Sequence, residues 1–125
     1  MESRDKQILD LAMEAGKTLL DAGAEIFRAE ETIQRIAKAY GIERCSAFVM
    51  STGIFLTAES KGEDIYAQVR HIPINSARLN RVAAVNQLSR EIVEGRYTVE
   101  EAWERLEAIK QMPGKRILQG FWHQA

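Results

Sequence analysis

Residues 16–41 read GKTLLDAGAEIFRAEETIQRIAKAYG, and this stretch contains the end of one helix, a sharp break and a second helix. Apolar residues recur at helical spacing on both sides of the break. Gly23 tolerates the positive φ at which helices commonly end, and Gly41 repeats that signal. The pattern predicts helices over about residues 4–22 and 24–40. Neither apolar stripe is wide enough to be buried on all sides, so each helix is expected to cover one side of another element.

Charged residues follow the break between these helices. Glu25 lies in the first turn of the second helix, where exposed amides favour negative charge. Arg28 lies one turn further on, and Glu31 and Arg35 have i,i+4 spacing. One interpretation is a solvated face, whose pairs each contribute about 0.2–0.5 kcal/mol. The other is that Glu25 and Arg28 line a polar site at the junction.

The outer face of the first helix carries charged residues at helical spacing. This face is expected to be solvated. Its residues are Asp5, Lys6, Asp10, Glu14, Lys17 and Asp21.

Composition limits the class of protein. The 125 residues are enough for one domain with a substantial core. The 46% hydrophobic and 28% charged content is typical of soluble globular chains. Seventeen Lys and Arg residues oppose eighteen Asp and Glu residues, so no basic field indicates a nucleic-acid partner.

The targeting and redox signals in the sequence also favour a soluble globular protein. Cys45 is the single cysteine, which excludes an internal disulfide and favours a reducing compartment. The first ten residues are polar and mixed in charge, unlike a signal peptide. No apolar run reaches the roughly 18–20 residues that a membrane span needs. These residues are therefore not expected to cross a bilayer.

The middle of the sequence predicts three strands. CSAFVMS (45–51) and IFLTAES (54–60) flank a short turn, and IYAQVRHI (65–72) follows a second turn near Gly62. Short turns between successive strands indicate an antiparallel meander.

A third helix is predicted over about residues 77–94. Asn86 and Ser89 lie on its otherwise apolar stripe and are expected to face protein. Asn86 then either anchors a neighbouring loop or belongs to a polar lining, and both interpretations stay open. Thr98 and Glu101 form a capping-box pattern that predicts the start of a fourth helix.

The predicted fold class is α+β: two helices, a three-stranded antiparallel meander and two helices, with the helices packed on one sheet face. The opposite face would carry Tyr66, Gln68 and Arg70 or their alternates, and it is a candidate surface for homo-oligomer formation.

Catalytic and cofactor motifs are not evident in the sequence. It has no phosphate-binding glycine loop, no dinucleotide fingerprint and no G-x-S-x-G motif. His71 and His123 lack metal-ligand spacing, so we predict no metal and no cofactor. A weak hydrolase signal remains, because His71 could approach hydroxyl and thiol groups near the hairpin, although the sequence shows no third, orienting group. These groups belong to Cys45, Ser46, Ser51 and Thr52.

Three motifs in order resemble the soluble N-terminal domain of the ThrE-type threonine/serine exporter family. They are LLDAGAEIFRAEETIQRIAKAYG (19–41), FVMSTGIFLTAES (48–60) and RLNRVAAVNQLSREIVEGRYTVEEAWERLEAI (78–109). The resemblance covers roughly residues 7–113. It implies a domain at the cytoplasmic face of the membrane, preceding membrane helices and linked to export of threonine and serine. In a split form of the family, this domain works with a small membrane partner and is linked to export of dicarboxylates such as succinate. Hydrolase-like character without a settled reaction is also associated with the domain.

The resemblance implies a boundary near the end of the chain. Residues 1–113 correspond to the soluble domain, and in the family membrane helices begin where residues 114–125 form a basic and aromatic tail. Two explanations stay open: a fragment of a longer protein, or a stand-alone soluble homologue. The expected function is accessory or regulatory to transport, with membrane helices of the same or a partner protein. The alternatives are a dicarboxylate exporter component, a small hydrolase and a plain assembly module.

The last expectation concerns a ligand site for a small amino acid or a dicarboxylate. We predict that four polar residues converge near one cleft, namely Glu25, Arg28, Asn86 and Arg90. A zwitterion needs an anion and a cation at close range, whereas a dicarboxylate would favour the arginines, with Arg78 and Arg81 as further candidates. The rival explanation is structural: Glu25 pairs with an arginine and Asn86 holds a loop, with no ligand.

Overall fold

The computed structural model describes residues 3–50, 53–60, 63–70 and 79–112. Within these ranges the chain forms four helices and an antiparallel sheet, which confirms the α+β class. The elements are α1 (Ser3–Asp21), α2 (Ile26–Ala39), β1 (Arg44–Met50), β2 (Gly53–Ser60), β3 (Glu63–Arg70), α3 (Leu79–Val93) and α4 (Val99–Lys110).

Helix α1 ends where its sequence predicts. Gly23 has a φ of 93°, and its N–H donates to the carbonyl of Leu20 at 3.0 Å. The N–H of Ala24 donates to the carbonyl of Leu19 at 2.9 Å. These two bonds form a Schellman motif, which satisfies carbonyls that the last turn would otherwise leave unpaired.

Helices α1 and α2 approach each other closely at Gly16. A Cβ atom at this position would lie 2.5 Å from Cδ1 and 2.7 Å from Cγ1 of Ile33, which is fully buried. Gly16 therefore leaves the space that the Ile33 side chain fills. The two helices form one tightly packed layer.

The sheet covers one side of this helix layer. Its strand order is β1-β2-β3, and α2 packs on β1 while α1 reaches β2 and β3. The inward residues of β1 and β2 are buried, namely Ala47, Val49, Ile54, Leu56 and Ala58. The edge strand β1 is also tied to α2, because the N–H of Val49 donates to Oε2 of Glu30 at 2.8 Å. This bond satisfies a backbone group at the sheet edge.

The outward face of the sheet points away from the helices. Phe48 pairs with Phe55, which pairs with Gln68, so these three positions share a face. Phe48 is 61% exposed. The β3 side chains, those of Tyr66 and Arg70 among them, and the predicted turns at 51–52 and 61–62 lie outside the described residues. A homo-oligomer surface on this face stays a prediction.

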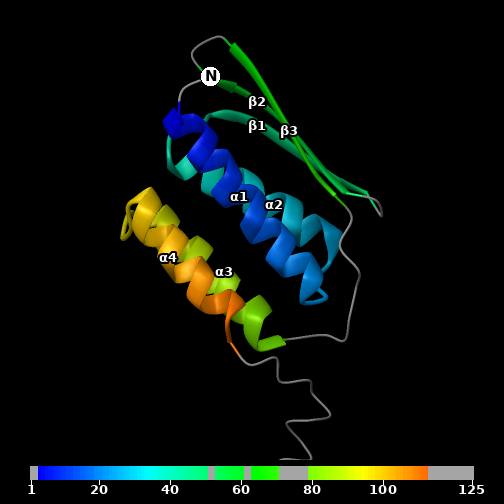
Figure 1. Ribbon diagram of the computed structural model, residues 1–125, viewed down its shortest axis with the longest axis vertical. Helices are drawn as coiled ribbons and strands as arrows, with labels where there is room; N and C mark the ends of the chain where they lie inside the picture. Colours follow the sequence, from blue (N-terminus) through cyan, green and yellow to red (C-terminus); the bar gives the residue numbers. More distant parts are fainter. Residues whose placement is uncertain (1–2, 51–52, 61–62, 71–78, 113–125) are drawn as a thin grey trace, which may run out of the picture.

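Helices α3 and α4 form a third layer on the opposite side of α1 and α2 from the sheet (Figure 1). The prediction that the helices pack on one sheet face holds for α1 and α2 and is wrong for α3 and α4. The physical reason is the width of the buried surface of α1, which is apolar on more than one side. Its buried residues with large or small apolar side chains are Ile8, Leu9, Leu11, Ala12, Met13, Ala15 and Leu19.

The corner between α3 and α4 is fixed by its caps and by tyrosines. The predicted capping box is confirmed, since Thr98 Oγ1 accepts from the N–H of Glu101 at 3.1 Å and Glu101 Oε1 accepts from the N–H of Thr98 at 2.9 Å. The hydroxyl of Tyr40 donates to the carbonyl of Tyr97 at 2.9 Å, and the Tyr97 hydroxyl donates to Oε1 of Glu91 at 3.0 Å. Through these bonds the end of α2 holds the corner.

The Gly16 contact predicts a stability effect. We expect Gly16→Ala to lower the free energy of unfolding, because overpacking costs about 1–3 kcal/mol and exceeds the gain in helix propensity of about 1 kcal/mol. Urea unfolding followed by circular dichroism measures the change. In an Ile33→Val background, which removes Cδ1, the same substitution should cost less. An unchanged or higher midpoint for Gly16→Ala would contradict the close approach.

The corner predicts a pH effect. Hydrogen bonds from Gln87 and then Tyr97 lower the pKa of Glu91 below its ordinary value of 4.5. A lowered pKa adds stability that is present above 4.5 and is lost as the pH falls through the lower folded value. Glu91→Gln should therefore be less stable than wild type at pH 7, and the difference should shrink below pH 4.5. Urea midpoints at several pH values test this, with the exposed Glu104→Gln as the control. A difference that is independent of pH would refute it.

Candidate functional site

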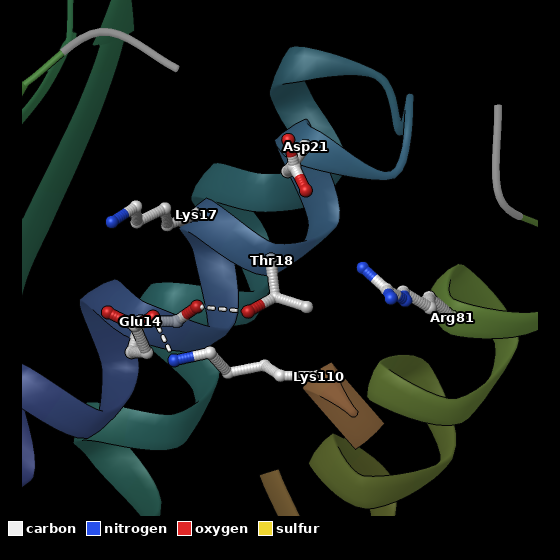
Figure 2. A pocket seen from close by; sticks show the side chains of 6 residues that line it. All are labelled: Glu14, Lys17, Thr18, Asp21, Arg81 and Lys110. Carbon is white, nitrogen blue, oxygen red and sulfur yellow. Dashed lines mark hydrogen bonds and ion pairs between the residues drawn. The ribbon is translucent and has the colours of Figure 1, made fainter. Parts of the chain in front are cut away.

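A polar hollow of about 260 Å³ lies where α1 faces α3 and α4 (Figure 2). We call it the α1–α3–α4 hollow. Its lining residues are Glu14, Lys17, Thr18, Asp21, Arg81 and Lys110.

One wall of the α1–α3–α4 hollow is a single stripe of α1. Glu14, Lys17, Thr18 and Asp21 follow one another at spacings of three, one and three residues, which places them on one face of a helix. The Thr18 hydroxyl donates to the carbonyl of Glu14 at 2.8 Å, so its oxygen keeps acceptor capacity. This wall offers two carboxylates, one ammonium group and one hydroxyl.

Lys110 of α4 reaches across to this wall. Its Nζ lies 2.8 Å from Oε2 of Glu14, and the two side chains are 32% and 23% exposed. The hydrogen bond to Glu14 raises the pKa of Lys110, so the ammonium form is favoured in the folded chain. This partly buried pair joins α1 to α4 at one end of the hollow.

Arg81 of α3 forms the opposite wall. Its Nη2 donates to the carbonyl of Met112 at 2.8 Å, which holds the guanidinium in place. Its Nε is buried, and no described residue accepts a hydrogen bond from it. Figure 2 shows the side chain extending from α3 toward α1, with Thr18 on the facing wall and Asp21 one turn beyond. Lys17 and Asp21 form no ion pair or hydrogen bond with the other described side chains.

The predicted ligand residues do not all lie here. Of the six, Arg81 lines the α1–α3–α4 hollow, and Arg78 lies outside the described residues. Glu25 is the exposed N-cap of α2 and makes no side-chain capping bond. Arg28 stacks over the Phe27 ring with its Cζ 5.8 Å from the centroid.

Asn86 and Arg90 follow each other on α3. Asn86 is half-buried, and the exposed Arg90 donates to Oε1 of Gln87 at 2.6 Å. No hydrogen bond or ion pair among the described residues joins Glu25 to either side chain. Convergence of this set in one cleft therefore stays a prediction. The expectation that Ser89 faces protein is confirmed, since it is fully buried.

Sequence reasoning missed five lining residues. Glu14, Lys17 and Asp21 were expected on a solvated face, and the packing of α3 and α4 turns that face into a wall. The signal available in the sequence was Thr18, a hydroxyl at i+4 from Glu14 and i−3 from Asp21. Lys110, in the last turn of α4, carried no comparable signal.

The hydrolase interpretation gains no support from the hairpin. Burial raises the pKa of the Cys45 thiol to about 11, so the nucleophilic thiolate is scarce at neutral pH. Ser51, Thr52 and His71 lie outside the described residues. Within the described ranges, no three His, Cys, Asp or Glu residues gather in a way that could hold a metal ion.

Comparison with known proteins defines the class. The model of the family described as "Putative threonine/serine exporter" (ThrE) matches residues 10–123. The chain therefore belongs to this family, which gives it an exporter-related role. Searches of curated proteins and of solved structures found no match. None of the helices in the described part of the chain has both the length and the apolar character to span a bilayer.

The half-buried Cys45 thiol is expected to react slowly. At pH 8 we expect folded Cys45 to react with Ellman's reagent about 100-fold more slowly than a thiol with the reference pKa of 9.0, because its pKa of about 11 lowers the thiolate fraction by that factor. The chain unfolded in urea is the control and should react at the ordinary rate. Equal rates in the folded and unfolded chain would show that Cys45 is accessible and ionised.

Proposed function

We propose that this chain is a cytoplasmic domain that assists or regulates the export of threonine and serine across the membrane. The observation that carries the proposal is the family match over residues 10–123. Because no described helix is a candidate membrane span, the proposed pathway is built by membrane helices of the same or a partner protein. The domain works at their cytoplasmic face.

The α1–α3–α4 hollow supports a solute-related role. It gathers two carboxylates and three cationic groups, and it is smaller than the roughly 300–1,000 Å³ pockets that hold drug-sized ligands. A site of this size and polarity suits a small charged metabolite. A regulatory domain of an exporter would use such a site to sense the solute that is to be exported.

A second candidate is a component of a dicarboxylate exporter of the succinate type. The observation that favours it is the excess of cations over carboxylates in the lining of the α1–α3–α4 hollow. Three of these side chains are cationic (Lys17, Arg81 and Lys110), and two are carboxylates (Glu14 and Asp21). The net charge of these five side chains is +1 when each is ionised. A dianion would gain from that field, although Asp21 would repel one of its carboxylates.

The proposed function predicts that export depends on this chain. Membrane helices of the family are expressed with and without the chain in cells loaded with threonine, serine or succinate, and extracellular solute is followed over time. We expect efflux of threonine and serine to require the chain, and succinate efflux to change little. If only succinate efflux required the chain, the second candidate would be favoured. Efflux of all three solutes that is unaffected by the chain, at equal membrane-protein levels, would refute both.

A further inference from the structure

We propose that the α1–α3–α4 hollow binds a small zwitterionic amino acid, with Asp21 holding the ammonium group and Arg81 holding the carboxylate. This proposal rests on the proposed function for its biological role, but its physical basis is the arrangement of charges in the hollow itself.

Some charged groups of the α1–α3–α4 hollow are paired with each other, and others are available to a ligand. Glu14 and Lys110 neutralise each other at 2.8 Å. Among the described side chains, Lys17 and Asp21 have no ion-pair partner, and Arg81 bonds only a backbone carbonyl. One carboxylate and two cations therefore remain to meet a ligand.

Arg81 is held in place and still has an N–H group without an acceptor among the described residues. Its Nε is buried and has no acceptor among the described residues, and a buried N–H without a partner is uncommon in folded proteins. Nη2 is already held by the carbonyl of Met112, so the guanidinium is oriented before any ligand arrives. A guanidinium prefers a planar anion such as a carboxylate, which it binds through parallel N–H groups.

The α1 wall supplies the carboxylate of the proposed site, that of Asp21. Asp21 accepts hydrogen bonds only, so it is suited to an ammonium group. Thr18 lies one turn before Asp21, and its methyl group points toward Arg81 (Figure 2). Its hydroxyl is turned toward the carbonyl of Glu14, to which it donates. The wall therefore offers Asp21 to the ammonium group and the Thr18 methyl group to the side chain of a small amino acid, such as serine or threonine.

Ligands with two charges of the same sign fit the α1–α3–α4 hollow less well. A dicarboxylate would place negative charge near Asp21, where like charges repel. A diamine would place positive charge near Arg81 and Lys17. Among these charge types, a ligand with one ammonium and one carboxylate places each of its charges beside a group of opposite sign.

Calorimetric titration of the folded 125-residue chain tests this. We expect heat from threonine and serine at millimolar concentration. N-acetylthreonine lacks the ammonium and threonine amide lacks the carboxylate, and each should bind at least about tenfold more weakly. Equal binding of threonine and either derivative would overturn the proposal, as would no heat from threonine or serine.

Two variants locate the site. Asp21→Asn should weaken threonine binding at least about tenfold and should strengthen succinate binding, because it removes the repulsive charge. Arg81→Gln should weaken the binding of both ligands.

The matched control is Glu31→Gln, an exposed carboxylate of α2 outside the hollow, and it should bind threonine like wild type. Circular dichroism confirms that each variant is folded, and if Arg81→Gln does not fold, the opposite changes expected for Asp21→Asn decide alone. Threonine binding that is unchanged in Asp21→Asn would overturn the proposal.

The two proposals fail separately. If threonine does not bind but efflux depends on the chain, the binding site is wrong and the exporter role stands. If threonine binds and Asp21→Asn abolishes this, while efflux does not depend on the chain, the site stands and the exporter role is wrong.

Discussion

The contact between Gly16 and Ile33 sets the spacing of the helix layer on which the rest of the chain is assembled. A side chain at residue 16 would meet Cδ1 of Ile33 at 2.5 Å, so glycine alone lets α1 lie this close to α2. The sheet packs on one side of this pair, and α3 with α4 packs on the other (Figure 1). Since interiors are packed densely and tolerate little change in volume, a shift at this contact would move both outer layers relative to each other.

The same arrangement explains where polar groups collect. Helix α1 is buried by the sheet, by α2 and by the α3–α4 pair, yet it keeps a stripe of polar side chains. That stripe lies where α3 and α4 meet α1, so it becomes the wall of a hollow instead of an open surface. The pair of Glu14 with Lys110 ties the wall to α4, and the bond of Arg81 to the carbonyl of Met112 ties α3 to the chain after α4. The hollow is thus held from all three helices.

Local features were predictable because they depend on neighbouring residues. The glycine stop at Gly23 and the capping box at Thr98 gave the helix limits to within about two residues, close to the uncertainty of any assignment. The placement of α3 and α4 was not predictable, because an amphipathic stripe shows that a helix is buried but not which element buries it. The lining of the site was missed for the same reason, because it depends on where α3 and α4 pack. Arg81 was predicted as a candidate arginine for a dicarboxylate, whereas Glu14, Lys17 and Asp21 gain their role only from the helices opposite them.

The order of the charged residues along α1 explains why Lys17 and Asp21 do not pair with each other in the hollow. Lys17 precedes Asp21 by four residues, and a cation that precedes its anion is the weaker order for an i,i+4 pair. The helix itself therefore provides little reason for these two side chains to pair. Glu14 could pair with Lys17 at i,i+3, but Lys110 occupies its Oε2 from across the hollow. Tertiary packing thus pairs one carboxylate and leaves Asp21 and Lys17 without an ion-pair partner among the described side chains. The order of Lys17 and Asp21 on α1, together with Lys110 from α4, therefore produces a site with both signs of charge.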